Sequence, residues 1–177
     1  MTAGLFITFE GGEGSGKSTQ TQLLAAGLRE AGRDVVALRE PGGTALGEEL
    51  RKLLLHKDKA VSVEAELLMF LAARAELVNE VIRPALDAGG VVICDRFSDS
   101  TVAYQGYGRG VDVSAIKTLN RWATGGLQPD LTVLLDVPVE VGRKRKHGDD
   151  DVFYRESEGF HSRVREGYRF LAASEPS

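Results

Sequence analysis

The sequence has very little cysteine and no long apolar run. Cys94 is the single cysteine among 177 residues, so the chain can form neither an internal disulfide nor a cysteine-rich metal site. It lies in the apolar run 91–94, where a buried thiol in a reducing cytoplasm is expected. No apolar run approaches the roughly 18 residues that span a membrane, and no charged-then-apolar leader precedes the first apolar run. These absences predict a cytoplasmic protein without a membrane partner.

The sequence also has no excess of positive charge. The 22 lysines and arginines are outnumbered by 26 acidic residues, giving a net charge of −4, which argues against broad affinity for nucleic acid. Any anion site must therefore be local. A length of 177 residues allows one sizeable core, and no internal repeat or low-complexity linker divides it. We expect residues 1–177 to form a single domain.

A glycine-rich motif, GGEGSGKST, follows the alternating apolar run 5–9. Its order of strand, glycine loop and helix is that of a phosphate-binding loop (P-loop), in which backbone N–H groups surround a phosphate, a lysine adds charge and a hydroxyl meets Mg²⁺. A glycine-rich surface turn is the alternative. The predicted ATP phosphate-binding residues are Gly11, Gly12, Glu13, Gly14, Ser15, Gly16, Lys17, Ser18 and Thr19.

Strand and helix patterns alternate along the rest of the chain. Buried strands are predicted over 5–9, 35–38, 91–94 and 131–135, and helices over 17–31, 45–56, 63–86, 112–123 and 156–173. The helix 63–86 should bend near Pro84, and Trp122 is predicted on a buried helix face. This alternation predicts a three-layer α/β/α fold of the P-loop NTPase type with a parallel sheet.

Charged residues follow two of the predicted strands. Arg39 follows the second strand, and Asp95 and Arg96 follow the third. Since open α/β sheets bind ligands at the carboxyl ends of their strands, Asp95 is suited to hold Mg²⁺ and both arginines can meet phosphate. The alternatives are a solvated arginine and a surface ion pair. The polar stretch 98–110 reads as a binding wall or as a solvated loop.

Arg74 falls on an apolar helix stripe, four residues after Phe70. Because an unpaired buried guanidinium is costly, either its head reaches water or it meets a polar ligand. Phe70 alone would be read as core. A basic run, 143–146, precedes three aspartates and is either a solvated face or a mobile segment that closes over ATP phosphates.

Together these motifs resemble the thymidylate kinase family over about residues 5–168. The matching segments are Phe9-Glu10-Gly11, Lys17-Ser18-Thr19-Gln20, Arg39-Glu40-Pro41-Gly42-Gly43-Thr44, Asp95-Arg96-Phe97 and Ala103-Tyr104-Gln105-Gly106. The resemblance implies about five parallel strands and the transfer of a phosphoryl group from ATP to dTMP. That reaction gives dTDP and ADP in dTTP synthesis, with Mg²⁺ as cofactor in a homodimer.

The resemblance also implies roles for individual residues. Glu13 lies near the sugar 3′-hydroxyl, Arg39 and Arg96 hold the dTMP phosphate, Phe70 and Arg74 meet the thymine, Thr101 and Gln105 read its edge, and Tyr104 crowds the 2′ position. The predicted catalytic residues are Lys17, Arg96 and Arg145, and the metal ligands are Ser18 and Asp95. No general base is expected, because a phosphate with a second pKa of about 6 is already anionic.

Two segments depart from the family pattern. The lid, at about 142–156, has Asp151-Val152 where relatives carry Asp-Arg, so that Arg143 or Arg155 could replace Arg145. The family's last strand and helix are expected to be absent, leaving a truncated chain or an incomplete adenine site. A deoxynucleoside kinase and a regulatory ATPase are the alternative functions, although the Asn-Lys-x-Asp motif of GTPase switches is missing.

Overall fold

The computed structural model describes residues 4–55, 61–145 and 152–174. Its centre is a parallel sheet in the order β2-β3-β1-β4. The strands are β1 (Leu5–Glu10), β2 (Val35–Arg39), β3 (Val91–Asp95) and β4 (Leu131–Leu134). The predicted parallel α/β fold is confirmed, with four strands in the described part of the chain against the implied five.

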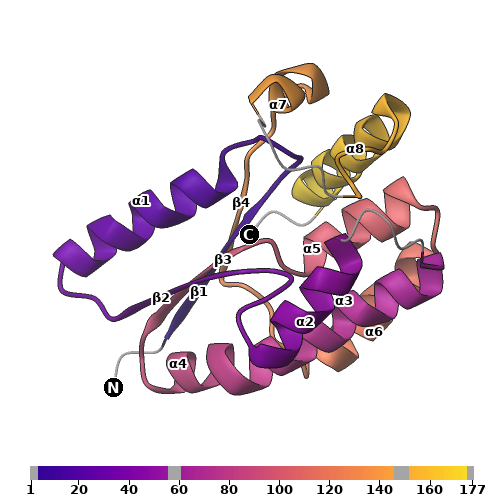
Figure 1. Cartoon of the computed structure of the whole chain (residues 1–177). Helices are drawn as coiled ribbons and strands as arrows, with labels where there is room; N and C mark the ends of the chain where they lie inside the picture. Colours follow the sequence, from indigo (N-terminus) through magenta and orange to yellow (C-terminus); the bar gives the residue numbers. More distant parts are fainter. Residues whose placement is uncertain (1–3, 56–60, 146–151, 175–177) are drawn as a thin grey trace.

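Helices cover both faces of the sheet (Figure 1). They are α1 (Lys17–Glu30), α2 (Ala45–Leu55), α3 (Val63–Leu77), α4 (Arg83–Asp87), α5 (Ser98–Thr101), α6 (Val113–Ala123), α7 (Val139–Arg145) and α8 (Glu158–Ser174), with π-helical turns η1 (Val78–Ile82) and η2 (Val102–Gly108). Helix α1 lies on one face, and α3, η1 and α4 lie on the other. Within the described ranges, no helix is long and apolar enough to cross a bilayer.

Alternate residues of each strand feed the two cores. Phe6 and Val92 pack with Leu77 and Ile82 on the α3 side, whereas the next residues along the strands face α1. This period of two is the one expected for a strand buried on both faces. Because parallel strands end at one edge, β1 and β3 bring the P-loop beside Asp95, with Phe9 opposite Asp95 in the register.

Two details of the helix predictions differ. The helix expected over 63–86 is interrupted by η1, just before Pro84, which lacks an N–H group to continue the hydrogen-bond ladder. The prediction of a buried Trp122 is wrong, since its side chain is 83% exposed on α6. Helix α6 is capped by Asp112, whose carboxylate accepts from the backbone N–H groups of Ser114 and Ala115.

Helix α7 packs backbone to backbone on the P-loop. A Cβ atom added at Gly142 would lie 2.2 Å from the carbonyl oxygen of Glu13, and one added at Gly14 would lie 2.1 Å from the oxygen of Gly142. Gly14 also has φ +65°, a left-handed conformation that suits glycine. No side chain fits between these segments, so α7 fixes the outer wall of the loop.

We expect Gly142→Ala to lower the free energy of unfolding by about 1–3 kcal/mol, because the methyl group must push α7 from the loop. Gly27→Ala is the control. It lies within α1 with nothing within 4 Å of an added Cβ, so it should raise stability by about 0.5–1 kcal/mol. Urea unfolding of both variants measures this, and equal stability of Gly142→Ala and wild type would contradict the close packing.

Candidate active site

The P-loop connects β1 to α1 and is closed by its own lysine. Lys17 Nζ donates to the carbonyl oxygens of Gly11 (3.0 Å) and Gly12 (2.8 Å) and to Ser15 Oγ (3.3 Å). Burial, and then the charge of Arg96, lower the pKa of Lys17 to about 8. An anion beside this amine would favour its charged form, which is the behaviour that phosphate binding needs.

The two predicted metal ligands meet directly. Ser18 Oγ donates to Asp95 Oδ2 at 2.5 Å, which joins the start of α1 to the end of β3. A hydroxyl and a carboxylate are the hard oxygen donors that Mg²⁺ prefers, and this ion commonly takes one or two protein ligands and fills its shell with water and phosphate oxygens. The pair therefore fits a magnesium ion, even though no cluster of three acidic, His or Cys side chains is found among the described residues.

One cavity of about 800 Å³ joins nearly all the predicted site residues. It runs from the P-loop to the side chains of α3 and η2. Every residue of the predicted site lines it except Gly11 and Gly12, whose carbonyl groups turn toward Lys17. The cavity thus brings Lys17 of the P-loop together with Phe70 of α3 and Gln105 of η2.

Arg96 lines this cavity and has an unusual backbone conformation. It is the one non-glycine residue with positive φ (74°) among those described. Its Nη1 donates to the carbonyl of Gly11 (3.2 Å), and its Nη2 donates to Glu13 Oε1 (2.7 Å) and Tyr104 Oη (3.1 Å). Tyr104 Oη donates to the same carboxylate oxygen at 3.0 Å. A strained backbone held by so many contacts is typical of a functional position.

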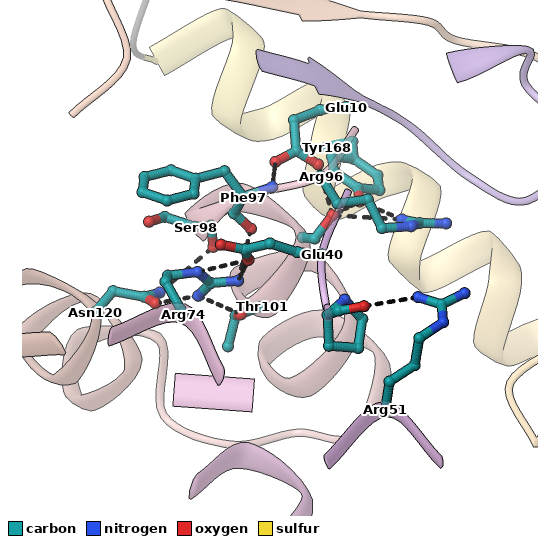
Figure 2. Close-up of polar contacts among 12 residues, drawn as sticks. Glu10, Glu40, Arg51, Arg74, Arg96, Phe97, Ser98, Thr101, Asn120 and Tyr168 are labelled. Atoms are coloured by element: carbon teal, nitrogen blue, oxygen red, sulfur yellow. Dashed lines mark hydrogen bonds and ion pairs between the residues drawn. The ribbon is translucent and has the colours of Figure 1, made fainter. Parts of the chain in front are cut away.

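Arg74 lines the cavity and is only 1% exposed. Figure 2 shows its guanidinium surrounded by hydrogen-bonding partners. Its Nε and Nη2 donate to Glu40 Oε2 at 2.8 and 2.6 Å, and Nη1 donates to Thr101 Oγ1 and Asn120 Oδ1. Nη2 also donates to the carbonyl of Phe97. From the sequence, the guanidinium was expected to reach water or a polar ligand. In the structure it pairs instead with a buried carboxylate from the β2–α2 loop.

The three arginines that could act from the lid face different parts of the molecule. Arg145 lines the main cavity, as predicted. Arg143 instead lies 5.7 Å from the centre of the Tyr154 ring and lines a small separate cavity behind the P-loop, and Arg155 is exposed. Residues 146–151 of the predicted lid lie outside the described ranges. Arg145 is thus the better placed of the three.

Comparison with known proteins agrees with this geometry. A family model described as thymidylate kinase matches residues 9–177. The chain belongs to the thymidylate kinase family. It is 58% identical over 172 residues to a thymidylate kinase of Synechococcus sp. (strain JA-2-3B'a(2-13)), covering 97% of this chain and 82% of that protein. A thymidylate kinase of Halothermothrix orenii is 52% identical over 174 residues, covering 96% and 84%.

A solved structure of a thymidylate kinase supports the fold as well. The crystal structure from Ehrlichia chaffeensis superposes with a TM-score of 0.84 at 42% identity, covering 98% of this chain and 89% of that one. The resemblance drawn from the motifs is therefore confirmed at the level of family and fold.

Several residues of this thymidylate kinase site were missed from the sequence. Phe153 and Arg51 line the cavity, and Glu40 and Asn120 hold Arg74. Glu10, described next, was also missed. It is the one residue of this group that the strand pattern could have revealed, because it continues the alternation of Phe6 and Thr8, whose side chains face the core. The others find their partners across the fold, which no local pattern reveals.

Glu10 is a buried acid beneath Arg96. Its Oε1 accepts from the backbone N–H of Phe97 (2.7 Å) and its Oε2 accepts from Ser100 Oγ (2.6 Å). The Ser100 hydroxyl in turn lies 2.7 Å from Tyr168 Oη. Burial, and then the charge of Asp99, raise the pKa of Glu10 from 4.5 to about 7. Between these pH values we expect the folded protein to hold a proton on Glu10 that the unfolded chain releases.

We expect the stability gained from that proton to be complete below pH 4.5 and lost as pH rises through about 7. The difference in free energy of unfolding between wild type and Glu10→Gln should fall by up to roughly 3 kcal/mol across this range. Denaturant titrations at a series of pH values measure it. Glu30→Gln, on the exposed side of α1, should show a constant difference, and a constant difference for Glu10→Gln would contradict the assignment.

Proposed function

We propose that this thymidylate kinase family member carries out its reaction, the transfer of the γ-phosphoryl group of ATP to dTMP, in the cavity described above. The products are dTDP and ADP, in the cytoplasm, as a step of dTTP synthesis. One observation carries the proposal: a single cavity holds a phosphate loop at one end, an aromatic and amide wall at the other, and Arg96 between them. A donor and an acceptor can therefore meet there.

The donor end consists of the P-loop. Lys17 exchanges the carbonyl groups of Gly11 and Gly12 for the β- and γ-phosphate oxygens of ATP, and the N–H groups of the loop and the start of α1 hold the remaining oxygens. Ser18 and Asp95 would hold Mg²⁺, which neutralises charge on the phosphates when bound. This division leaves the far side of Arg96 for the acceptor.

The acceptor end consists of the side chains that the family pattern assigns to dTMP. Arg39 and Arg96 bind its phosphate, and Glu13 meets the sugar 3′-hydroxyl. Phe70 lies against the thymine face, and Arg74 meets a thymine carbonyl by sharing one of its N–H groups. Thr101 and Gln105 read the base edge, and Tyr104 crowds the sugar. All eight side chains line the same cavity.

The reaction needs alignment and charge more than proton transfer. An oxygen of the dTMP phosphate attacks the γ-phosphorus, the bond from that phosphorus to the β–γ bridging oxygen breaks, and ADP leaves. The attacking oxygen is already anionic near neutral pH, since the second pKa of a phosphate monoester is about 6. Arg96 and Arg145 stabilise the negative charge that spreads over the transferring phosphoryl group, and Lys17 stays in contact with that group during the transfer.

We expect ADP formation over a panel of acceptors to be fastest with dTMP, because only dTMP places a charged phosphate and a thymine at the two ends of the acceptor site. Lys17→Met should lower kcat by roughly a hundredfold or more, since it removes a charge that acts on the transferring group. A coupled spectrophotometric assay measures both.

Lys52→Met is the matched control, because this lysine is exposed and pairs only with Glu49 on α2 among the described residues. Its kcat should equal that of wild type. Preference for thymidine over dTMP would instead indicate a deoxynucleoside kinase, and ATP hydrolysis without any preferred acceptor would indicate a regulatory ATPase.

We also propose a homodimer, as the family pattern implies. Trp122 on α6 and Leu68 on α3 expose 83% and 58% of their surface, and these two helices contact each other. Large exposed apolar side chains of this kind are common where two chains meet. Light scattering should give a mass of twice 19.1 kDa, and a mass of 19.1 kDa at micromolar concentration would contradict the proposal.

A further inference from the structure

An ion pair lies behind the wall that is assigned to the base edge. Gln105, 1% exposed, donates from Nε2 to Glu66 Oε1 at 2.8 Å. Glu66 comes from the first turn of α3, and Arg109 faces it with a two-pronged contact, Nε to Oε1 and Nη2 to Oε2, both at 3.2 Å. Neither Glu66 nor Arg109 lines the cavity. They can act on a ligand only through the residues in front of them.

Arg109 is itself fixed on several sides. Its Nη1 donates to Glu156, and its guanidinium lies 5.6 Å from the centre of the Phe153 ring and 4.9 Å from that of Phe160. Because these contacts come from the segment before α8 and from α8, the guanidinium has little freedom to turn away from Glu66. The carboxylate is therefore held in one orientation.

This arrangement fixes which way the Gln105 amide points. A carboxylate only accepts hydrogen bonds, so the amide must turn its NH₂ group to Glu66. Its carbonyl oxygen is then the end left for a ligand. A side-chain amide without such a neighbour could present either group.

The neighbouring hydroxyl is fixed with the opposite polarity. Thr101 Oγ1 accepts from Arg74 Nη1 at 2.8 Å (Figure 2). Among the described residues the Thr101 hydroxyl donates to no other group, so its hydrogen can be donated into the cavity that Thr101 lines. A cation stands behind Thr101, and an anion stands behind Gln105. Together they offer one donor and one acceptor along the cavity wall.

We propose that Glu66, held by Arg109, is a positioning residue that sets the base specificity of the acceptor site. The inference rests on the proposed function, which places the base at Thr101 and Gln105. The Thr101 donor matches the C4 carbonyl of thymine, and the Gln105 acceptor matches the adjacent N3–H. Cytosine presents an amino group and a bare N3 at the same edge, so it would meet a donor with a donor and an acceptor with an acceptor.

The test compares kcat/KM for dTMP and dCMP in wild type and Glu66→Gln. A glutamine at 66 can offer either an oxygen or an NH₂ group, so it no longer dictates the orientation of the Gln105 amide. We expect the ratio of kcat/KM for dTMP to that for dCMP to fall by roughly tenfold or more. The change should appear mainly in KM for the nucleotide, with kcat for dTMP little altered.

Glu64→Gln is the matched control, since it makes the same change on an exposed position of the same helix turn. Its ratio should equal that of wild type. A wild-type ratio in folded Glu66→Gln would overturn the proposal, and thermal unfolding establishes that the variant is folded. Should Glu66→Gln fail to fold, Arg109→Lys replaces it. That variant keeps the charge but loses the two-pronged contact with Glu66, so it should lower the ratio of kcat/KM for dTMP to that for dCMP by a smaller factor. An unchanged ratio in this variant would equally overturn the proposal.

Gln105→Leu separates this inference from the proposed function. If the base lies at Gln105, Gln105→Leu raises KM for dTMP, and adding Glu66→Gln to it changes the ratio no further. An equal effect of Glu66→Gln with and without Gln105 would show that Glu66 does not act through the amide. An unchanged KM for dTMP in Gln105→Leu would instead show that the base does not lie at Gln105. That result would contradict both the proposed base site and the role of Glu66.

Discussion

The structure of this site depends on the guanidinium of Arg96, a half-buried cation at the edge of the P-loop. It contacts the P-loop through Gly11, the acid Glu13 and the hydroxyl of Tyr104, so that β1, β3 and η2 converge on it. Its left-handed backbone costs of order 1–3 kcal/mol, which the surrounding contacts must offset. In the proposed reaction, this geometry would place a fixed positive charge between two sets of phosphates that would otherwise repel each other.

Three arginine–glutamate pairs lie in or behind the wall of the cavity. Arg96 pairs with Glu13, Arg74 with Glu40, and Arg109 with Glu66. Taking such pairs out of water is costly, and hydrophobic residues of similar size often stabilise a fold as well or better. Their value in this molecule is direction, since each pair holds a hydrogen-bonding group of the wall in one orientation.

The sequence predicted the elements whose signals are local. The P-loop, the strands and the helices expected over 112–123 and 156–173 all follow from spacing or from residue type. It also identified many of the cavity-lining side chains, though not Phe153 or Arg51, through the rule that ligands bind where parallel strands end and through the family motifs. These features need no knowledge of which distant segments touch.

The remaining features depend on tertiary contact. Glu40 reaches Arg74 across 34 residues and Asn120 reaches it across 46, so neither partner could be read from the apolar stripe on which Arg74 lies. Trp122 fits a helical apolar pattern, yet no described element covers it. Periodicity shows which face of a helix is apolar, but only the packing of neighbouring elements decides whether that face is buried.

A crystal structure with dTMP and a non-hydrolysable ATP analogue tests the central claim most directly, namely that Arg96 stands between donor and acceptor. We predict that the dTMP phosphate lies within hydrogen-bond distance of Arg96, with the terminal phosphates of the analogue at Lys17 and the thymine against Phe70. A dTMP phosphate bound away from Arg96, or a thymine outside the wall formed by Phe70 and Gln105, would contradict the account.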